Sequence, residues 1–158
     1  MDEASQPTRL TPPEGLYPGK LDDKGRLKLA VGFQEYLKDK PLFVTSLDRT
    51  IARIYPLSVW LERKKALEAF TGDEAEAAEH IQFNAIDLGS EAQMDSQGRV
   101  TFSPELRTEL NMAESPVRIY GVAEWVEVIT DQAYQQKRNA AISGTPAALT
   151  ALKKAGFK

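Results

Sequence analysis

A nine-residue pattern that occurs twice is the feature that most constrains how this 158-residue chain can fold. Residues 21–29 read LDDKGRLKL and residues 94–102 read MDSQGRVTF, so both follow the order apolar-Asp-x-x-Gly-Arg-apolar-x-apolar. Apolar positions downstream keep the same offset of 73 residues, as Phe33 and Leu106 do. We therefore expect two related halves of one fold, joined by a connector.

Both halves predict the same local elements. Gly25 and Gly98 supply the positive φ that a tight turn requires, and alternating apolar residues after each turn indicate a short strand. A helical turn and a strand hairpin should follow in each half, and Ser103 before Pro104 is a favourable helix start. The expected ranges are 31–38, 42–46 and 51–55 in the first half, and 104–110, 117–120 and 124–129 in the second.

The segment between the halves, residues 57–88, predicts two helices. Gly72 should end the first helix, and Asp73 with Glu76 should form a capping box for the second. This connector holds seven acidic and three basic side chains, so much of the negative charge of the chain lies there.

The two ends of the chain carry weaker signals than the repeats. The proline-rich N-terminus predicts a mobile arm. The C-terminus predicts either a short helix from Pro146 to Lys154, with Thr145 as its N-cap, or a frayed tail. The expected organisation is an arm (1–14), a first repeat (15–56), the connector (57–88), a second repeat (89–135) and a helical or flexible tail (136–158).

Composition excludes several classes of chemistry. The chain has no cysteine and one histidine, His80, which rules out disulfides, thiolate sites and multi-histidine metal sites. No apolar stretch is long enough to span a bilayer, and no phosphate-binding loop, dinucleotide or metal-binding motif is present. We expect a cytoplasmic protein that is not an enzyme and has no cofactor, metal, membrane or small-molecule partner. The net charge of −3, taken alone, argues against a nucleic-acid partner.

The charges around the two turns differ. Asp22 and Asp95 can accept backbone hydrogen bonds of their turns and can pair with Arg26 and Arg99, four residues later. Each arginine is either a strut for its turn, which the motif alone favours, or a guanidinium projected outward to bind an anion. The flanking residues are basic at the first turn and neutral at the second, so we infer that the first copy faces a polyanion and the second is mainly structural. The basic residues are Lys20, Lys24, Arg26 and Lys28, and the neutral ones are Gln93, Ser96 and Gln97.

These motifs resemble those of a known family. Residues 15–27, GLYPGKLDDKGRL, resemble the N-terminal half of MraZ proteins, and residues 94–100, MDSQGRV, resemble their second half. The likeness covers about residues 15–135, and two copies at this offset are far more specific than one. The family pattern often begins with Met-Phe-x-Gly, whereas here fourteen residues precede Gly15 and no phenylalanine stands there. The chain also departs from the pattern at three later positions: Ala30 and Ser103 stand where proline is usual, and Gln34 stands where arginine is usual.

The resemblance implies an α+β fold built as a two-repeat, AbrB-like swapped-hairpin β-barrel with a helical connector. It implies a bacterial transcriptional regulator of the nucleoid, expected to act as a repressor. Such a protein binds repeated sites in double-stranded DNA upstream of the division and cell-wall gene cluster, as a ring-shaped homo-oligomer. Because a closed ring uses head-to-tail contacts, we expect these sites to be direct repeats.

Roles for the individual residues follow from their chemistry. Arg26 is the expected base-reading residue, because a guanidinium pairs bidentately with guanine. Ammonium groups suit phosphates, which set register on the duplex but carry no sequence information, so we expect phosphate contacts from Lys20, Lys24 and Lys28. The residues expected to structure the two turns are Asp22, Gly25, Asp95, Gly98 and Arg99.

Two other functions are alternatives to this one. A pair of aspartates on related turns suggests an aspartic protease, but such enzymes need Asp-Thr/Ser-Gly, and the adjacent arginines here would keep both acids ionised. The stronger alternative is an AbrB-like antitoxin or interaction module that binds DNA only secondarily. Antitoxins of this type usually carry one repeat per chain, so two repeats and a helical connector favour the regulator.

Overall fold

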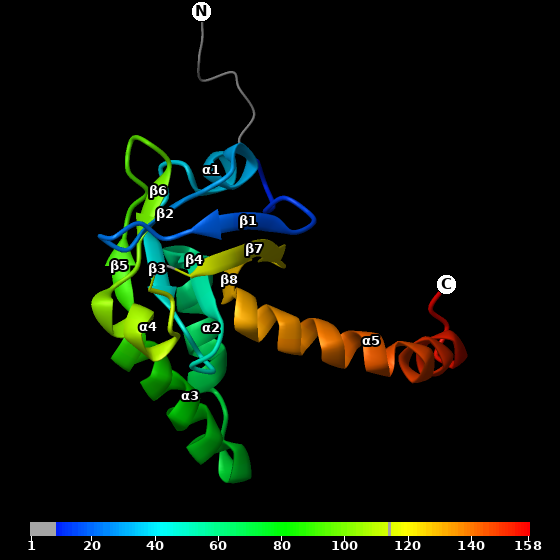
Figure 1. Ribbon diagram of the computed structural model, residues 1–158. Coiled ribbons are helices and arrows are strands. Elements are labelled where there is room, and N and C mark those ends of the chain that lie inside the picture. The colour runs from blue at the N-terminus through cyan, green and yellow to red at the C-terminus, as the bar shows by residue number, and fades with distance from the viewer. Residues whose placement is uncertain (1–8, 114) are drawn as a thin grey trace, which may run out of the picture.

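The computed structural model describes residues 9–113 and 115–158 and has an α+β fold (Figure 1). The strands are β1 (Tyr17–Lys20), β2 (Arg26–Lys28), β3 (Leu42–Thr45), β4 (Ala52–Pro56), β5 (Ser90–Ala92), β6 (Arg99–Thr101), β7 (Pro116–Val122) and β8 (Trp125–Thr130). The helices are α1 (Val31–Leu37), α2 (Leu57–Glu68), α3 (Ala75–Leu88), α4 (Pro104–Glu109) and α5 (Asp131–Lys154), with a short 3₁₀ turn, η2 (Gly72–Glu74), before α3.

Strand pairing interlocks the two halves of the chain. The main sheet has the order β1-β7-β8-β4-β3-β5, with antiparallel neighbours throughout. The first strand of each half therefore pairs in the other half, β1 with β7 and β5 with β3, while β2 pairs with β6 in a separate two-stranded ribbon. The expected α+β class is confirmed. The described strands form an open six-stranded sheet and a ribbon, and not one closed barrel.

The core lies between the ribbon and one face of the sheet. Leu27 of β2 and Val100 of β6 are fully buried and pack in one cluster with Ile54 and Val128 of the sheet. Phe33 of α1 and Leu106 of α4, the aligned pair of the repeat, are also fully buried in this cluster. Side chains alternate along a strand, so the residues on either side of Leu27 in β2 and of Val100 in β6 point outward. These residues give the ribbon a polar outer face.

The opposite face of the sheet is covered by the connector. Tyr55 lies between Trp60 of α2 and Trp125 of β8, with ring centroids 5.4 and 5.5 Å away. Trp125 is buried and lies beneath the guanidinium of Arg63, 4.7 Å from the ring centroid. The connector is thus packed against the sheet on the side away from the ribbon.

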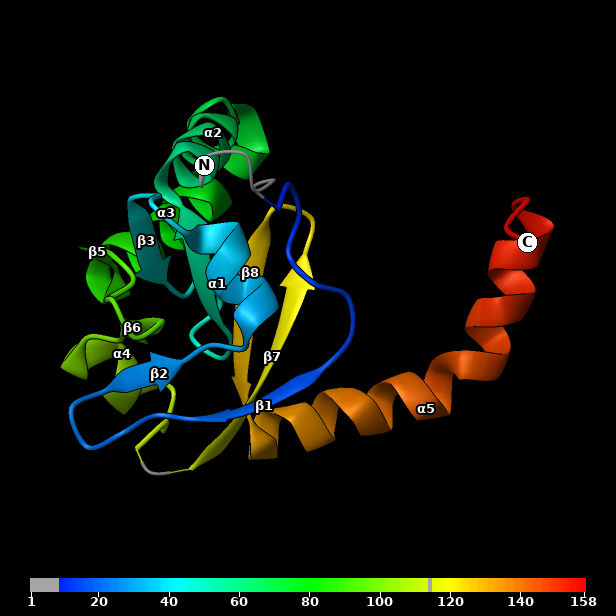
Figure 2. The same ribbon diagram turned by 90° about the horizontal axis from the view of Figure 1, so that it is seen from above.

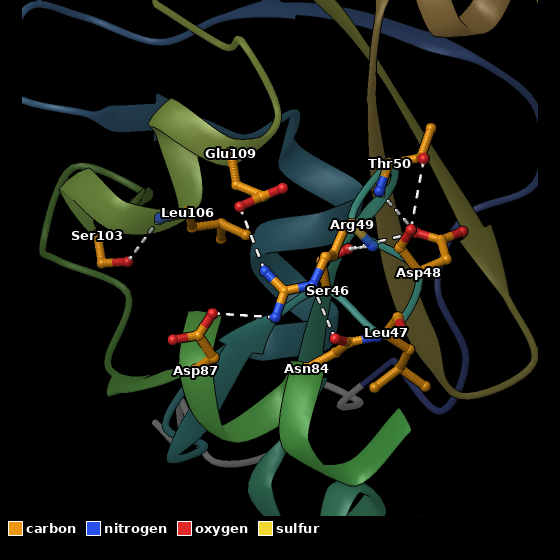
Figure 3. A network of polar contacts seen from close by, with 10 residues as sticks. All are labelled: Ser46, Leu47, Asp48, Arg49, Thr50, Asn84, Asp87, Ser103, Leu106 and Glu109. Atoms are coloured by element: carbon orange, nitrogen blue, oxygen red, sulfur yellow. Dashed lines mark hydrogen bonds and ion pairs between the residues drawn. The ribbon is translucent and has the colours of Figure 1, made fainter. Parts of the chain in front are cut away.

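One arginine ties three parts of the chain together (Figure 3). Arg49, in the turn between β3 and β4, donates from Nε to Asn84 Oδ1 at 2.7 Å and from Nη2 to Asp87 Oδ2 at 3.0 Å, both on α3. Its Nη1 donates to Glu109 Oε1 of α4 at 3.2 Å. Arg49 thus links the first half to the connector and to the second half. Because Nε and both terminal nitrogens are engaged by these acceptors, Arg49 is poorly suited to bind an external anion.

Local predictions at the helix ends met different outcomes. Ser103 is confirmed as the N-cap of α4, because its Oγ accepts from Leu106 N at 3.2 Å. The capping box at Asp73 and Glu76 is wrong: residues 72–74 form the 3₁₀ turn, and α3 begins without a side-chain cap.

Residues 146–154 are helical as predicted, but the predicted start of that helix at Thr145 and Pro146 is wrong. A single helix, α5, begins after the N-cap Thr130 and runs through Pro146 to Lys154. Thr145 does not cap a new helix; its hydroxyl donates to the carbonyl of Ala141 inside α5. A proline removes one helical hydrogen bond and favours a kink, and α5 changes direction part-way along its length (Figure 2). None of the described helices is both long and apolar enough to cross a membrane.

The expected N-terminal arm, residues 1–14, falls partly outside the described residues, which begin at Arg9. Pro12 and Pro13 are buried. A Cβ added at Gly121 would contact Pro12, and one added at Gly32 would contact Pro13, so these two prolines pack closely against β7 and α1.

The hairpin turns of the two halves carry equivalent backbone strain. Arg49 has φ +61° and Ala123, in the matching turn between β7 and β8, has φ +50°. For an L-residue this left-handed conformation costs roughly 1–2 kcal/mol, and glycine avoids that cost at a smaller entropic penalty. We predict that Ala123→Gly raises the free energy of unfolding by about 0.5–1 kcal/mol in urea titrations.

The matched control is Ala52→Gly in β4, where φ is not positive. There we expect a loss of at least about 0.5 kcal/mol, because glycine weakens a strand. Equal destabilisation by both substitutions would contradict the assignment of strain to Ala123.

Candidate nucleic-acid interface

The first turn is organised by the side chain of Asp22. Its Oδ1 accepts from the backbone amides of Lys24 at 3.0 Å and Arg26 at 2.9 Å, and Gly25 N donates to the carbonyl of Asp22 at 3.0 Å. Gly25 has φ +79°, a conformation that residues with a Cβ rarely adopt. The turn geometry therefore depends on an acid and a glycine at fixed spacing.

Arg26 is held by the same acid. Its Nε donates to Asp22 Oδ2 at 2.7 Å, and the two side chains are 30% and 33% exposed. Among the described residues, the terminal nitrogens of Arg26 have no hydrogen-bond partner. Arg26 can therefore fill both roles considered for it. Its Nε stabilises the turn, while the outer edge of its guanidinium faces solvent and could bind an anion.

The second turn repeats this geometry. Asp95 Oδ1 accepts from the amides of Gln97 and Arg99, both at 2.9 Å, and Arg99 Nε donates to Asp95 Oδ2 at 2.8 Å. Gly98 has φ +76°. The backbone of the two turns is thus equivalent, and any difference between them comes from the side chains.

Each turn is covered by a residue from the other half of the chain. The carbonyl of Gly25 accepts from Phe102 N at 2.8 Å, and a Cβ added at Gly25 would overlap the guanidinium of Arg107. Arg107 Nε donates to the carbonyl of Phe102 at 3.0 Å, which holds the guanidinium in place. The first turn therefore gains a third cation, Arg107, next to Lys24 and Arg26.

The second turn receives a neutral residue at the same place. The carbonyl of Gly98 accepts from Leu29 N at 3.0 Å, a Cβ added at Gly98 would overlap the amide group of Gln34, and Gln34 Nε2 donates to the carbonyl of Leu29 at 2.7 Å. Gln34 and Arg107 are separated by the 73-residue offset of the repeat. Sequence reasoning missed the role of Arg107, although this offset pairs it with Gln34.

The lysines do not all gather at the first turn as expected. Lys20 ends β1 just before the turn and Lys24 lies in the turn, and both are exposed. Lys28 lies opposite Arg99 in the antiparallel ribbon, and its ammonium donates to the carbonyl of Gln97. The expected placement of Lys28 at the first turn is wrong, because an antiparallel ribbon carries the end of β2 to the opposite turn.

The ribbon and its turns therefore form one exposed, mainly basic surface. Arg26, Lys28 and Arg99 alternate along it with the buried residues Leu27 and Val100. No group of three or more histidine, cysteine, aspartate or glutamate side chains within the described part of the chain could hold a metal ion. The chemistry of this surface is cationic and donor-rich, which suits an anionic partner.

Comparison with known proteins identifies the family, although no family model matches the chain. The transcriptional regulator MraZ of Acidobacterium capsulatum is 30% identical over 128 residues, covering 77% of this chain and 84% of that protein. The protein of the same name from Corynebacterium glutamicum is 33% identical over 132 residues, covering 82% and 90%. The chain belongs to the MraZ family. A third MraZ, from Mycolicibacterium smegmatis, is 32% identical over 128 residues, with 80% and 86% covered.

The MraZ family resemblance drawn from the two motifs is thereby confirmed. Family membership also makes a transcriptional regulator the coarse functional class. Within this MraZ-family chain, the two Asp-x-x-Gly-Arg turns lie at the two ends of the β2–β6 ribbon and differ in the residues that cover them.

The ion pairs of the two turns give folding stability a defined dependence on pH. The backbone amide of Arg26, followed by its guanidinium, holds the pKa of Asp22 below its usual value, and Arg99 acts on the pKa of Asp95 in the same way. An acid whose pKa is lowered by folding stabilises the protein above its unfolded pKa, and this contribution is lost as the pH falls through the folded value. We predict that Asp22→Asn with Asp95→Asn flattens the decline in urea stability as the pH falls through and below 3.8, the usual pKa of an aspartate.

Asp23→Asn is the control, because Asp23 makes no hydrogen bond to its turn among the described residues. It should leave the pH dependence as in the wild type. An undiminished decline in the double variant would contradict the role given to the two turn acids.

Proposed function

We propose that this MraZ-family protein is a sequence-specific regulator that binds double-stranded DNA through the first turn of the ribbon. The observation that carries the proposal is the convergence of three cationic side chains on that turn, Lys24 and Arg26 from one half and Arg107 from the other. A projecting loop or ribbon of this size fits the major groove, where each base pair has a distinct pattern of donors and acceptors.

Each basic residue has a separate role in the proposed complex. Arg26 reads a guanine with its two terminal nitrogens while Asp22 fixes its Nε, so its guanidinium needs little reordering on binding. Lys20 and Lys24 contact phosphates as point charges and fix the register. Lys28 lies at the other end of the ribbon, where its ammonium donates to the Gln97 carbonyl, and takes no part in this contact, and Arg107 positions the turn.

Self-assembly is part of the proposal. One chain offers few cations and has a net charge of −3, so tight binding requires several first turns to act together. Head-to-tail contacts in a ring-shaped homo-oligomer present neighbouring turns in the same orientation. Such a ring reads direct repeats spaced about 10–10.5 base pairs apart, one helical turn of DNA.

The proposed genomic target is the region upstream of the division and cell-wall gene cluster, where the protein acts in the nucleoid as a repressor. In the swapped-hairpin arrangement, residues 15–56 and 89–135 are the two repeats, with the connector 57–88 on the far side of the sheet. The interlocked strand pairs between the halves support this division. An antitoxin role is disfavoured by the presence of two such halves in one chain.

Arg26 and Arg99 form a matched pair for testing the proposal, because each is bonded to the aspartate of its own turn. We predict that Arg26→Ala weakens binding to tandem direct repeats at least about fivefold, since one bidentate contact to guanine is worth about 1–3 kcal/mol. Arg99→Ala should weaken binding much less at similar cost to stability. Equilibrium binding of fragments enriched by the wild type, measured over a range of salt concentrations, checks both variants.

Inverted-repeat and unrelated DNA of equal length serve as controls, and affinity for all three should fall with salt. If Arg26→Ala and Arg99→Ala lose equal affinity for DNA, the role of Arg26 is only structural. Preference for the inverted repeat would contradict head-to-tail assembly.

A further inference from the structure

Most of α5 lies outside the packed body of the protein. The helix leaves the sheet at β8 and projects away from it in both views (Figures 1 and 2). Every residue from Gln135 to Lys154 is exposed. Its 24 residues span about 36 Å, and a single helix without packing is only marginally stable in water.

The exposed part of α5 is apolar on one face and basic at both ends. Ile142, Leu149 and Leu152 are 55%, 43% and 49% exposed, and their spacing places them on one side of the helix. A shallow apolar groove beside Leu149 and Leu152 is lined by Ala140, Ala141, Gly144, Thr145 and Ala148. The bases are Lys137 and Arg138 before this stretch, and Lys153 and Lys154 after it.

The outer face of α3 has the complementary character. Phe83 and Ile86 are 59% and 65% exposed, although both are large apolar side chains. Glu76 and Glu79 lie on the same side of α3, because the series 76, 79, 83 and 86 follows helical spacing. The connector that carries this face has seven acidic side chains against three basic ones.

We propose that α5 of one copy docks on the outer face of α3 of a second copy. The inference rests on the homo-oligomer of the proposed function and identifies its contact surfaces. In such a contact Ile142, Leu149 and Leu152 cover Phe83 and Ile86, and the bases of α5 lie next to the acids of the connector. Burial of these side chains supplies the association energy, and the opposite charges set partner choice and orientation.

Two other occupants of the α5 face fit less well. Pairing of α5 with α5 brings bases together, because Asp131 is the one acid of the helix and it is paired with Arg118 at 3.2 Å. DNA would match the charge but would leave Ile142, Leu149 and Leu152 in water. Docking within one chain is disfavoured because α5 and α3 leave the body in different directions (Figure 1).

The proposed contact joins two different surfaces of the same chain. Such heterologous contacts leave one free α5 and one free α3 face in any open assembly, and a ring closes when these two meet. The contact therefore accounts for head-to-tail growth without any use of the ribbon surface.

The native mass of the full chain, measured by analytical ultracentrifugation without DNA, tests the proposal. The wild type should form an assembly of several chains. Ile142→Glu with Leu149→Glu should reduce the mass to that of one chain, 17.5 kDa, and so should Phe83→Glu with Ile86→Glu. Matched controls are Ser143→Glu with Thr150→Glu, one position along α5, and Ala77→Glu, on another side of α3, and they should keep the wild-type mass. All seven sites are exposed, and circular dichroism verifies folding.

Mixing the two monomeric variants gives a sharper result. Each retains one intact surface, so an equimolar mixture should form a species of twice the chain mass and nothing larger. A monomeric wild type, retention of the wild-type mass by either surface variant, or a mixture that stays monomeric would overturn the proposed contact. DNA binding by the wild-type samples, measured separately, shows whether the proposed function itself stands.

Discussion

Each Asp-x-x-Gly-Arg turn is held in place by the opposite half of the chain, and the rest of the structure depends on this exchange. The carbonyls of Gly25 and Gly98 accept from Phe102 and Leu29 across the β2–β6 ribbon. Positive φ values of +79° and +76° favour glycine at both positions, and the absence of a Cβ lets the covering side chains approach closely. Residues of both halves therefore surround each turn, and the fully buried cluster beneath the ribbon is likewise built from both halves.

The exchange also makes two equivalent turns chemically different. The covering position is Arg107 at the first turn and Gln34 at the second, so the first turn gains a cation and the second does not. Lys28 follows the first turn in the sequence, but its ammonium group lies at the second turn in the structure. The net charge of −3 is therefore a poor guide to partners. The connector, with seven acids against three bases, carries more net negative charge than the whole chain and lies on the other face of the sheet from the ribbon.

Much of this organisation could be predicted from the sequence, because the repeat is local and its turn chemistry is specific. The equivalent elements of the two halves and the Ser103 cap are examples. Contacts between the halves were harder to predict, because they join residues that are far apart in the sequence. Arg107 lies against Gly25 of the first turn, and Lys28 bonds to Gln97 of the second. The single helix through Pro146 was missed because a proline signals a break, whereas here the surrounding alanines and the hydrogen bond from Thr145 to Ala141 accommodate it.

In the proposed complex the first turn, and not its equivalent at the other end of the ribbon, contacts DNA. Photo-cross-linking tests it directly: a photoreactive side chain replaces Lys24 in one protein and Gln97, the matching residue of the second turn, in another. Both proteins are irradiated with the tandem-repeat fragment that the wild type enriches. We predict efficient cross-linking from position 24 and only background from position 97. Equal cross-linking from both positions, or cross-linking from position 97 alone, would contradict the claim.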